Sequence, residues 1–311
     1  MTDTAAMPIA IVGVGKIARD QHIPAIAADD RFTLAATVSR SGGVEGFENF
    51  ETVEDLLGAR PDIPALSLCM PPLPRFAAAT AALAAGRHVM LEKPPGATVA
   101  EVFKLDRLAR ARGVTLHATW HSRCADGVAA ARAWLRDRQI TRLRIDWRED
   151  VRKWHPGQDW IWQAGGLGVF DPGINALSIM TEILPHPLHL SGADLHFPEN
   201  RETPIAADLR FAGPGGIDAS AGFDWREEDG EVWEITVDTD GGELRLVDGG
   251  ARLLIDGTEQ PVEGPGEYPA LYHRFAELIE TAQSDVDPAP LIHVADAFML
   301  GRRVAVEPFH D

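Results

Sequence analysis

Positive charge, cysteine and long apolar runs are all scarce in this chain of 311 residues. The formal net charge is −18 at pH 7, which opposes binding to nucleic acid and to anionic membranes. With only two cysteines, Cys69 and Cys124, a framework of disulfides is excluded. One bridge between them is possible, but reduced thiols are the simpler expectation. No apolar run approaches the roughly 20 residues that a membrane-spanning helix needs.

The stretch MTDTAAMPIAIVGVG at the N-terminus has neither a basic leader nor a twin arginine. It is therefore expected to enter a first strand and not to act as a signal peptide, which favours a cytoplasmic location. Hydrophobic residues make up 45% of the chain and charged residues 24%, as in a soluble globular protein. The length suggests two domains.

The first third of the chain alternates between apolar runs and helical segments. The predicted strands are MPIAIVGV, FTLAATV, IPALSLCM, RHVML and VTLHATW. Helices are predicted at about 17–28, 75–86 and 97–113, the last with a capping box at Thr98 and Glu101 and a stop at Gly113. This pattern predicts an α/β domain over residues 1–120, an open parallel sheet with helices on both faces.

A second pattern begins after residue 120. A helix over 126–139 is followed by segments that alternate apolar and polar residues and are separated by glycine-rich turns. These predicted strands are LRIDWRED, ADLRF, IDASAGFDW, EVWEITVDT, GELRLVD and ARLLIDG. Helices over 268–283 and 291–303 close the chain. Residues 121–311 are thus predicted to form an α+β domain on an open, largely antiparallel sheet.

The segment IVGVGKIARD carries Gly13, Gly15 and Ala18, a G-x-G-x-x-A motif between a predicted strand and a predicted helix. The first glycine permits a tight turn, and the second lets the backbone approach a pyrophosphate at the helix N-terminus. The small third residue, Ala18, allows the helix and the strand to pack closely. The alternative is a glycine turn without a ligand, but the flanking elements favour a dinucleotide site.

The second strand ends in Ser39, Arg40 and Ser41, with no acidic residue before Glu45. An acid at this place usually holds the ribose hydroxyls of NAD, whereas a guanidinium and hydroxyls suit the 2′-phosphate of NADP. NADP is therefore the preferred expectation, with use of NAD as well left open. Arg40 as a solvated surface residue is the alternative.

The segment Glu92-Lys93-Pro94-Pro95 follows another predicted strand. Parallel sheets present ligand-binding residues at the carboxyl ends of their strands, so Lys93 is a candidate site residue. The proline behind it restricts the backbone, and one of the prolyl bonds could be cis. The alternative is a loop lysine beside a rigid turn.

The segment GGLGVFDPGIN places Asp171 and Pro172 as an expected N-cap and first helical residue. Asn175 then falls on the same helix face, one turn later. A carboxylate at a helix N-terminus is stabilised in its ionised form. Asp171 therefore suits the role of an orienting or proton-accepting group, and helix capping alone is the alternative.

The segment RIDWREDVRKWHPGQDWIWQ puts Glu149 on the same strand face as Ile145 and Trp147. A carboxylate on an apolar face points to a lined cavity. The loop behind it is rich in aromatic side chains and contains Trp154, His155, Trp160 and Trp162. Aromatic rings can stack on the apolar faces of a sugar, and carboxylates can bind its hydroxyls, so this combination suggests a sugar site. Core packing of the tryptophans and an exposed loop histidine are the alternatives.

His117, His121 and Cys124 have a loose metal-ligand spacing, but no fourth ligand is near in sequence, so no metal is expected. A G-x-S-x-G nucleophile elbow is absent as well.

The stretches IVGVGKIARDQHIPAI, HVMLEKPPGAT and GGLGVFDPGIN together resemble the glucose–fructose oxidoreductase and inositol dehydrogenase family. Within it, TWHSRCA, EDVRKWHPGQDWIW and FDPGINALSI resemble the bacterial group that oxidises L-arabinose or D-galactose at C1. The resemblance implies a Rossmann domain, a C-terminal open sheet and an active site between the two domains.

The resemblance also implies roles for individual residues. Lys93 would lie beside nicotinamide and substrate, with Asp171 as its partner. Many relatives carry a histidine where this chain has Asn175, which cannot titrate, and asparagine is the residue expected in the sugar 1-dehydrogenase group. Glu149, Trp154, His155 and Asn175 would bind the sugar. Further cofactor contacts are implied for Lys16, Ile17, Pro71, Glu92, His121 and Trp162.

The implied reaction is the NAD(P)-dependent oxidation of an aldopyranose at C1 to a lactone, with L-arabinose, D-galactose and D-fucose as expected substrates. A homodimer formed through the C-terminal sheet is expected. The alternative is a non-catalytic regulator of the same fold that binds a dinucleotide or a sugar.

Overall fold

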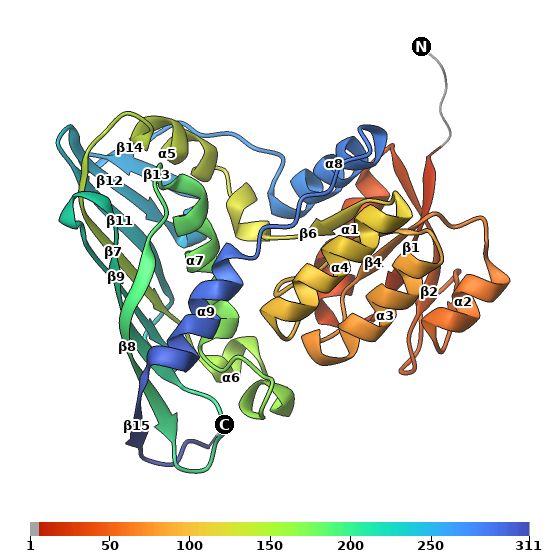
Figure 1. Cartoon of the computed structure of the whole chain (residues 1–311), viewed down its shortest axis with the longest axis horizontal. Coiled ribbons are helices and arrows are strands. Elements are labelled where there is room, and N and C mark those ends of the chain that lie inside the picture. Colours follow the sequence, from red (N-terminus) through yellow and green to blue (C-terminus); the bar gives the residue numbers. More distant parts are fainter. Residues whose placement is uncertain (1–5, 311) are drawn as a thin grey trace. The chain divides into compact units, whose positions relative to one another are not determined.

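The computed structural model of the chain describes residues 6–310 and divides them into two compact units (Figure 1). The first unit contains the chain up to His121 together with Gly266–Pro288. The second contains Ser122–Pro265 and the chain from Ala289 onward. The expected division into 1–120 and 121–311 does not include the return of the chain to the first unit. Within residues 6–310, none of the helices combines the length and apolar character that crossing a membrane requires.

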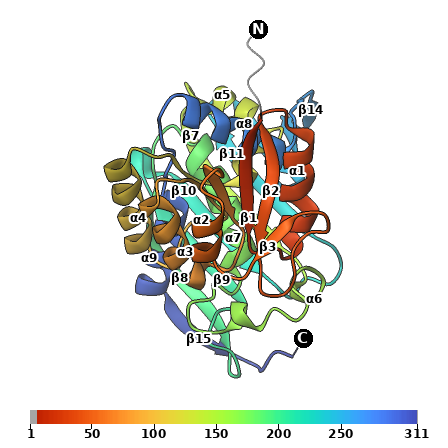
Figure 2. The same ribbon diagram turned by 90° about the vertical axis from the view of Figure 1, so that its right-hand side faces the viewer.

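The first unit is built on six parallel strands in the order β3-β2-β1-β4-β5-β6. The strands are β1 (Met7–Val12), β2 (Phe32–Val38), β3 (Glu48–Phe50), β4 (Ala65–Leu68), β5 (His88–Leu91) and β6 (Leu116–Ala118). Figure 2 shows β1, β2 and β3 side by side. This order is that of doubly wound dinucleotide-binding sheets, so the predicted Rossmann architecture is confirmed.

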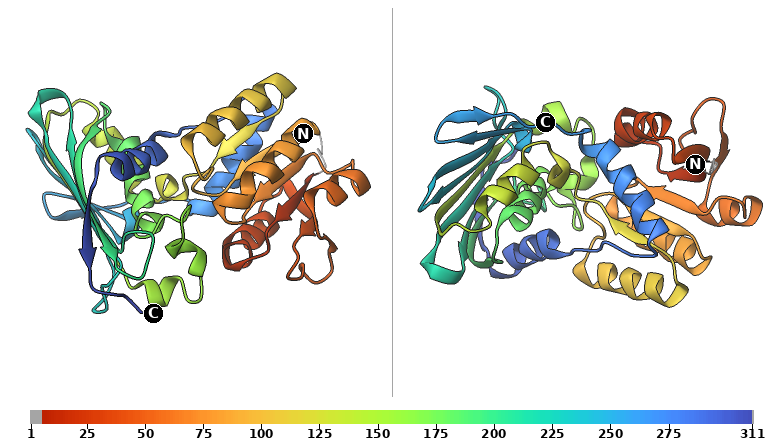
Figure 3. Two further views of the ribbon diagram at one scale, coloured as in Figure 1. Left: turned by 60° about the horizontal axis from the view of Figure 1, so that its bottom comes forward. Right: turned by 90° about the horizontal axis from the view of Figure 1, so that it is seen from above.

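Helices cover both faces of this sheet. They are a π-helical turn (Ala18–His22) continued by α1 (Ile23–Ala28), then α2 (Val53–Ala59), α3 (Pro72–Ala84), α4 (Val99–Arg112) and α8 (Glu267–Glu280). Helix α8 packs beside α1, and α3 packs beside α4 on the opposite face (Figure 3). The predicted caps of α4 are present, because Thr98 accepts a hydrogen bond from the Glu101 amide and Gly113 adopts a left-handed conformation.

The second unit is built on nine strands in the order β14-β13-β12-β11-β7-β10-β9-β8-β15. They are β7 (Ile140–Arg148), β8 (His189–Pro198), β9 (Ala206–Ala212), β10 (Asp218–Asp224), β11 (Val232–Thr239), β12 (Gly242–Val247), β13 (Arg252–Ile255), β14 (Thr258–Gln260) and β15 (Arg302–Val306). Most neighbours are antiparallel, as predicted, but β7 runs parallel to β10 and β8 parallel to β15.

One face of this sheet is covered by helices. They are α5 (Val128–Leu135), α7 (Phe170–Ile183) and α9 (Ala289–Leu300), which lie on the same side in Figure 1. Along β7, Leu143, Ile145 and Trp147 are buried and alternate with the more exposed Arg144 and Asp146. The polar face carries ion pairs such as Arg144 with Asp218. The dimer expected through this sheet stays a prediction.

In this unit one strand was missed and one helix was predicted too long. Strand β8 was not foreseen, because a register shift between Leu190 and Gly192 breaks the alternation of apolar and polar residues. The helix predicted over 291–303 ends at Leu300, and Gly301 is followed by strand β15. The arginines of GRR therefore begin an edge strand and do not end a helix.

Candidate active site

The glycine motif lies directly after β1 and forms an open turn. Gly13 has φ +90°, and a Cβ atom on it would lie 2.7 Å from the Met70 amide nitrogen, so glycine is required there. Gly15 is exposed, and no atom lies within 4 Å of the position that its Cβ would take. This open cradle at the start of a helix fits the pyrophosphate of a dinucleotide. Lys16 forms an ion pair with Asp20 on the next helical turn.

The loop after β2 offers hydroxyls and a guanidinium. The hydroxyls of Ser39 and Ser41 lie 3.2 Å apart, and the Asn49 amide donates to the Ser39 carbonyl at 2.9 Å. Arg40 is exposed beside them. The structure thus presents the polar groups that a ribose 2′-phosphate would need.

All predicted cofactor residues of the first unit follow the carboxyl ends of parallel strands, and the structure brings them to one edge of the sheet. They are Gly13, Gly15, Lys16 and Ile17 after β1, Ser39 and Arg40 after β2, Pro71 after β4, Glu92 and Lys93 after β5, and His121 after β6. The strand order reverses between β1 and β4, and ligands of such sheets bind at this reversal.

Lys93 is half-buried at the end of β5, and the bond between Lys93 and Pro94 is cis. The buried Arg75 of α3 fixes this turn, because its guanidinium donates to the carbonyls of Glu92 and Pro94. The same guanidinium donates to the Met70 carbonyl. One arginine thus joins the turn at Lys93 to the loop that contacts the glycine motif.

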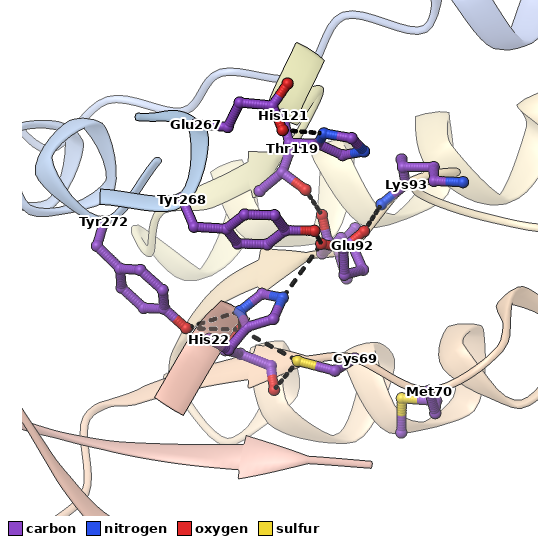
Figure 4. Close-up of polar contacts among 12 residues, drawn as sticks. His22, Cys69, Met70, Glu92, Lys93, Thr119, His121, Glu267, Tyr268 and Tyr272 are labelled. Atoms are coloured by element: carbon purple, nitrogen blue, oxygen red, sulfur yellow. Dashed lines mark hydrogen bonds and ion pairs between the residues drawn. The ribbon is translucent and has the colours of Figure 1, made fainter. Parts of the chain in front are cut away.

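The Glu92 side chain points into the unit (Figure 4). Its Oε1 accepts a hydrogen bond from the Tyr268 hydroxyl at 2.8 Å and lies 3.1 Å from Nε2 of His22. Its Oε2 accepts the Lys93 amide at 2.8 Å. The predicted contact of Glu92 with a cofactor stays a prediction, since its carboxylate faces inward.

The His22 and Glu92 side chains form a buried ion pair. Burial alone would lower the pKa of His22, but Cys69, Tyr272 and Glu92 raise that pKa well above its usual value. Burial alone would raise the pKa of Glu92, but the hydrogen bond and charge of His22 hold it well below its usual range. These partners therefore favour the charged form of both side chains against the cost of burial.

His121 is held by a second carboxylate. Its Nδ1 lies 2.8 Å from Oε2 of Glu267, and its ring stacks on Tyr268 at 5.6 Å between centroids. Burial disfavours the charged imidazole, but Glu267 outweighs it and raises the pKa of His121. Glu267 and Tyr268 therefore hold the His121 ring in one orientation (Figure 4), and its predicted contact with the cofactor stays a prediction.

The second unit places Glu149 at the end of β7, buried on the apolar face as predicted. Its Oε1 accepts a hydrogen bond from the Trp225 indole at 3.2 Å, and its Oε2 accepts one from the Trp233 indole at 3.0 Å. Two rigid donors therefore fix the orientation of this carboxylate.

His155 joins Glu149 to Asp171. Its Nε2 lies 4.0 Å from Oε1 of Glu149 and 3.6 Å from Oδ2 of Asp171, and its ring centroid lies 5.2 Å from that of Trp225. The imidazole therefore lies near both carboxylates, and the half-buried His155 does not fit the alternative of an exposed loop histidine. The predicted sugar-binding residues Glu149 and His155 and the predicted catalytic Asp171 form one polar cluster.

Helix α7 begins two residues earlier than predicted, with Val169 as its N-cap. Asp171 is therefore in the first turn and is not the cap, although the helix dipole still favours its negative charge. Gly173 lets the helix approach β10, because a Cβ there would lie 2.9 Å from the Phe223 ring. Asn175 is half-buried one turn beyond Asp171.

The two predicted tryptophans differ in their surroundings. Trp154 is exposed at the end of α6 (Val151–Trp154), and its indole donates to Glu231. Trp162 is buried, 5.3 Å from Trp225 between ring centroids. Within residues 6–310, no group accepts a hydrogen bond from its indole N–H. Sugar contact by Trp154 and cofactor contact by Trp162 stay predictions.

Both cysteines are free thiols, as expected. Among the residues that the structure describes, no three histidine, cysteine or acidic side chains are grouped so that they could hold a metal ion.

Sequence reasoning missed the residues that support the predicted ones. They are His22, Arg75, Trp225, Trp233, Tyr268 and Tyr272. The two tryptophans lie in predicted strands that gave no sign of polar contacts. The tyrosines lie in a helix that the sequence assigned to the other domain.

Three comparisons with known proteins bear on this arrangement. Residues 7–119 match the family GFO_IDH_MocA, described as an oxidoreductase family with an NAD-binding Rossmann fold. Galactose 1-dehydrogenase of Pseudomonas fluorescens is 47% identical over 303 residues, which cover 97% of this chain and 98% of that protein. The crystal structure of D-galactose-1-dehydrogenase from Rhizobium etli is 56% identical, with a TM-score of 0.95 and 100% of both chains covered.

A more distant structure, a 3-ketoreductase from Actinomadura kijaniata in complex with NADP and TDP-benzene, has a TM-score of 0.82 at 18% identity. It covers 97% of this chain and 99% of its own, and the likeness is one of fold alone. The chain therefore belongs to the oxidoreductase family of glucose–fructose oxidoreductase and inositol dehydrogenase, as its sequence motifs implied.

Proposed function

We propose that the protein is an NAD(P)-dependent aldose 1-dehydrogenase that oxidises an aldopyranose at C1 to the aldonolactone. The observation that carries this proposal is the 47% identity, over nearly the whole chain, to a galactose 1-dehydrogenase. D-Galactose is therefore the first expected substrate. L-Arabinose and D-fucose share its ring configuration and differ in the substituent at C5, so activity on both is expected.

Lys93 and Asp171 carry the reaction in this proposal. When bound, NADP supplies the acceptor for the hydride that leaves C1. The Lys93 ammonium stabilises the negative charge that develops on the anomeric oxygen. The proton of the anomeric hydroxyl passes to the Asp171 carboxylate, because neither the Lys93 ammonium nor the Asn175 amide can accept it.

Glu149, His155 and Asn175 bind the ring hydroxyls in this proposal. Both Glu149 oxygens already accept indole N–H groups, so the carboxylate presents its remaining lone pairs in a fixed direction. Such preorganised acceptors orient a sugar without first ordering their own side chains.

A direct absorbance assay tests the proposed function. The purified protein is mixed with NADP or NAD and a panel of aldoses, and the reduced-nicotinamide band is followed. Turnover with D-galactose, L-arabinose and D-fucose is expected. D-Glucose, which differs from D-galactose only in its configuration at C4, serves as the control. A regulator that only binds its ligands would show no reduction with any sugar.

The cofactor preference gives the first prediction. Arg40 lies beside Ser39 and Ser41 at the end of β2, where a guanidinium would pair with a 2′-phosphate. We expect a higher kcat/KM with NADP than with NAD in the parent. Arg40→Asp should reverse or erase this preference, because a carboxylate repels the phosphate and can bind the ribose hydroxyls.

The control for that experiment is Arg107→Asp, which makes the same charge change at an exposed position of α4 in the same unit. Its ratio of the two efficiencies should equal that of the parent. An unchanged ratio in Arg40→Asp would refute the assignment of Arg40 to the 2′-phosphate.

Sugar binding gives the second prediction. Asn175→Leu removes a donor and an acceptor, which leaves hydroxyls unpaired at a loss of about 1–3 kcal/mol. The apparent sugar affinity should therefore fall roughly 5- to 150-fold. The dissociation constant of NADP, measured by fluorescence quenching, should stay near its parent value. An equal loss for sugar and cofactor would mean that Asn175 is not a sugar ligand.

A further inference from the structure

The first unit contains a buried polar cluster that no step of the proposed reaction uses. The chain has only two tyrosines, Tyr268 and Tyr272, and both lie on α8. Figure 4 shows their hydroxyls directed at His22 and Glu92. The Tyr272 hydroxyl lies 2.8 Å from Nδ1 of His22 and donates to the Ser67 hydroxyl at 3.4 Å.

The cluster is connected to the main chain of Lys93 through a single carboxylate. Glu92 receives the Tyr268 hydroxyl and the His22 imidazole on Oε1 and the Lys93 amide on Oε2. Arg75 holds the carbonyls of Glu92 and Pro94 from the other side. The backbone on both sides of Lys93 is therefore fixed by buried groups.

Stability alone does not explain such a cluster. A buried ion pair of this kind is often no more stabilising than apolar side chains of the same size. His22 is 0% exposed and Glu92 is 4% exposed, so neither is accessible to a sugar in this structure. Buried charge of this kind is better explained by the need to fix one geometry, and the geometry that it fixes here is that of Lys93.

We propose that His22 and Tyr268 are positioning residues that act through Glu92 on Lys93. They hold the Glu92 carboxylate in one orientation, and Glu92 holds the Lys93 amide, so the ammonium is presented from a fixed root. The return of the chain to the first unit at Gly266–Pro288 contributes Tyr268 to this arrangement. The inference rests on the proposed function in one respect, that Lys93 is the catalytic lysine.

The first test reads the position of Lys93 without any sugar. The chain has four lysines, Lys16, Lys93, Lys104 and Lys153, so selective ¹⁵N-lysine labelling gives four backbone amide signals. An amide that donates to a carboxylate resonates downfield and exchanges slowly. In Tyr268→Phe, which removes only the hydroxyl, the Lys93 signal should move upfield and its hydrogen exchange should rise about tenfold. Lys104, on α4, should be unchanged.

The second test separates positioning from general loosening of α8. Tyr268→Phe should lower kcat about tenfold while the sugar KM and the NADP dissociation constant stay within about twofold, because misplacement affects the reacting geometry most. The control is Phe275→Leu, a buried residue of the same helix whose ring lies against those of Phe32 and His117 and makes no hydrogen bond. It should lower thermal stability and leave kcat near the parent value.

A double-mutant cycle then tests the route through Glu92. If Tyr268 acts only through that carboxylate, Tyr268→Phe should cause no further loss of kcat in a Glu92→Gln background. Full additivity of the two losses, or an unmoved Lys93 amide in Tyr268→Phe, would overturn the inference. His22→Gln, which keeps an N–H donor for Glu92, repeats both tests if Tyr268→Phe does not fold.

The two proposals fail in distinguishable ways. If none of the aldoses supports reduction of NADP by the parent, the proposed function is wrong. The amide signal of Lys93 still decides whether the cluster positions Lys93. If the parent is active but Tyr268→Phe keeps full turnover and an unmoved Lys93 amide, the function stands and the positioning role is wrong.

Discussion

Lys93→Met should fold and bind NADP nearly as the parent does, yet lose most of its turnover. Methionine keeps the length of the stem but removes the positive charge and the three donors. If the ammonium stabilises the developing anomeric oxyanion, its removal should lower kcat at least 10²–10³-fold, or about 2.7–4 kcal/mol. Cofactor binding is measured by fluorescence quenching and turnover by absorbance on the same sample.

Lys104→Met is the matched control, since it removes an exposed lysine from α4 of the same unit. Its turnover should equal that of the parent. The catalytic role of Lys93 would be abandoned if Lys93→Met, with cofactor bound, keeps turnover within about tenfold of the parent, a barrier change of only about 1.4 kcal/mol.

The edge of the first sheet was predictable because parallel strands carry positional information. Once the apolar runs are recognised as parallel strands, their carboxyl ends must lie at one edge. Gly13, Arg40 and Lys93 are therefore brought together without knowledge of any side-chain contact. The same reasoning placed Glu149 on the apolar face of β7, because strand parity fixes which side chains share a face.

The support for these residues was not predictable in the same way. Tyr268 and Tyr272 lie one helical turn apart, and this spacing indicates a buried helix face without saying what that face covers. Their partners His22 and Glu92 are far away in sequence, and only the return of the chain to the first unit brings them together. A lone histidine in an apolar helix gives no sign of a charged partner.

The errors in the second unit have local physical causes. The bulge near Gly192 reverses the parity of β8, so its apolar residues do not alternate regularly. The start of α7 was misplaced because Asp171 has the chemistry of an N-cap, whereas the N-cap is Val169, two residues earlier. The end of a helix is commonly uncertain by one or two residues, so a capping residue in the sequence does not fix it.

The polar cluster of the second unit should be as sensitive to substitution as Lys93. Asp171→Asn keeps the size of the side chain and the start of α7 but removes the group that accepts the anomeric proton. A positioned base contributes roughly 10²–10⁴-fold to such a step, so kcat should fall about 10³-fold, or about 4 kcal/mol. Sugar and cofactor affinities should change little, because asparagine still accepts and donates hydrogen bonds.

The pH profile identifies the cause of that loss. With Asp171 removed, hydroxide must take the proton, so turnover of Asp171→Asn should rise steadily with pH, by about tenfold per unit at most, between pH 7 and pH 10. The parent should reach a plateau in this range. Asp159→Asn removes an exposed carboxylate from the neighbouring aromatic loop and should behave like the parent. A loss in Asp171→Asn that is independent of pH would assign Asp171 to orientation of His155, 3.6 Å away, and the proton to another acceptor.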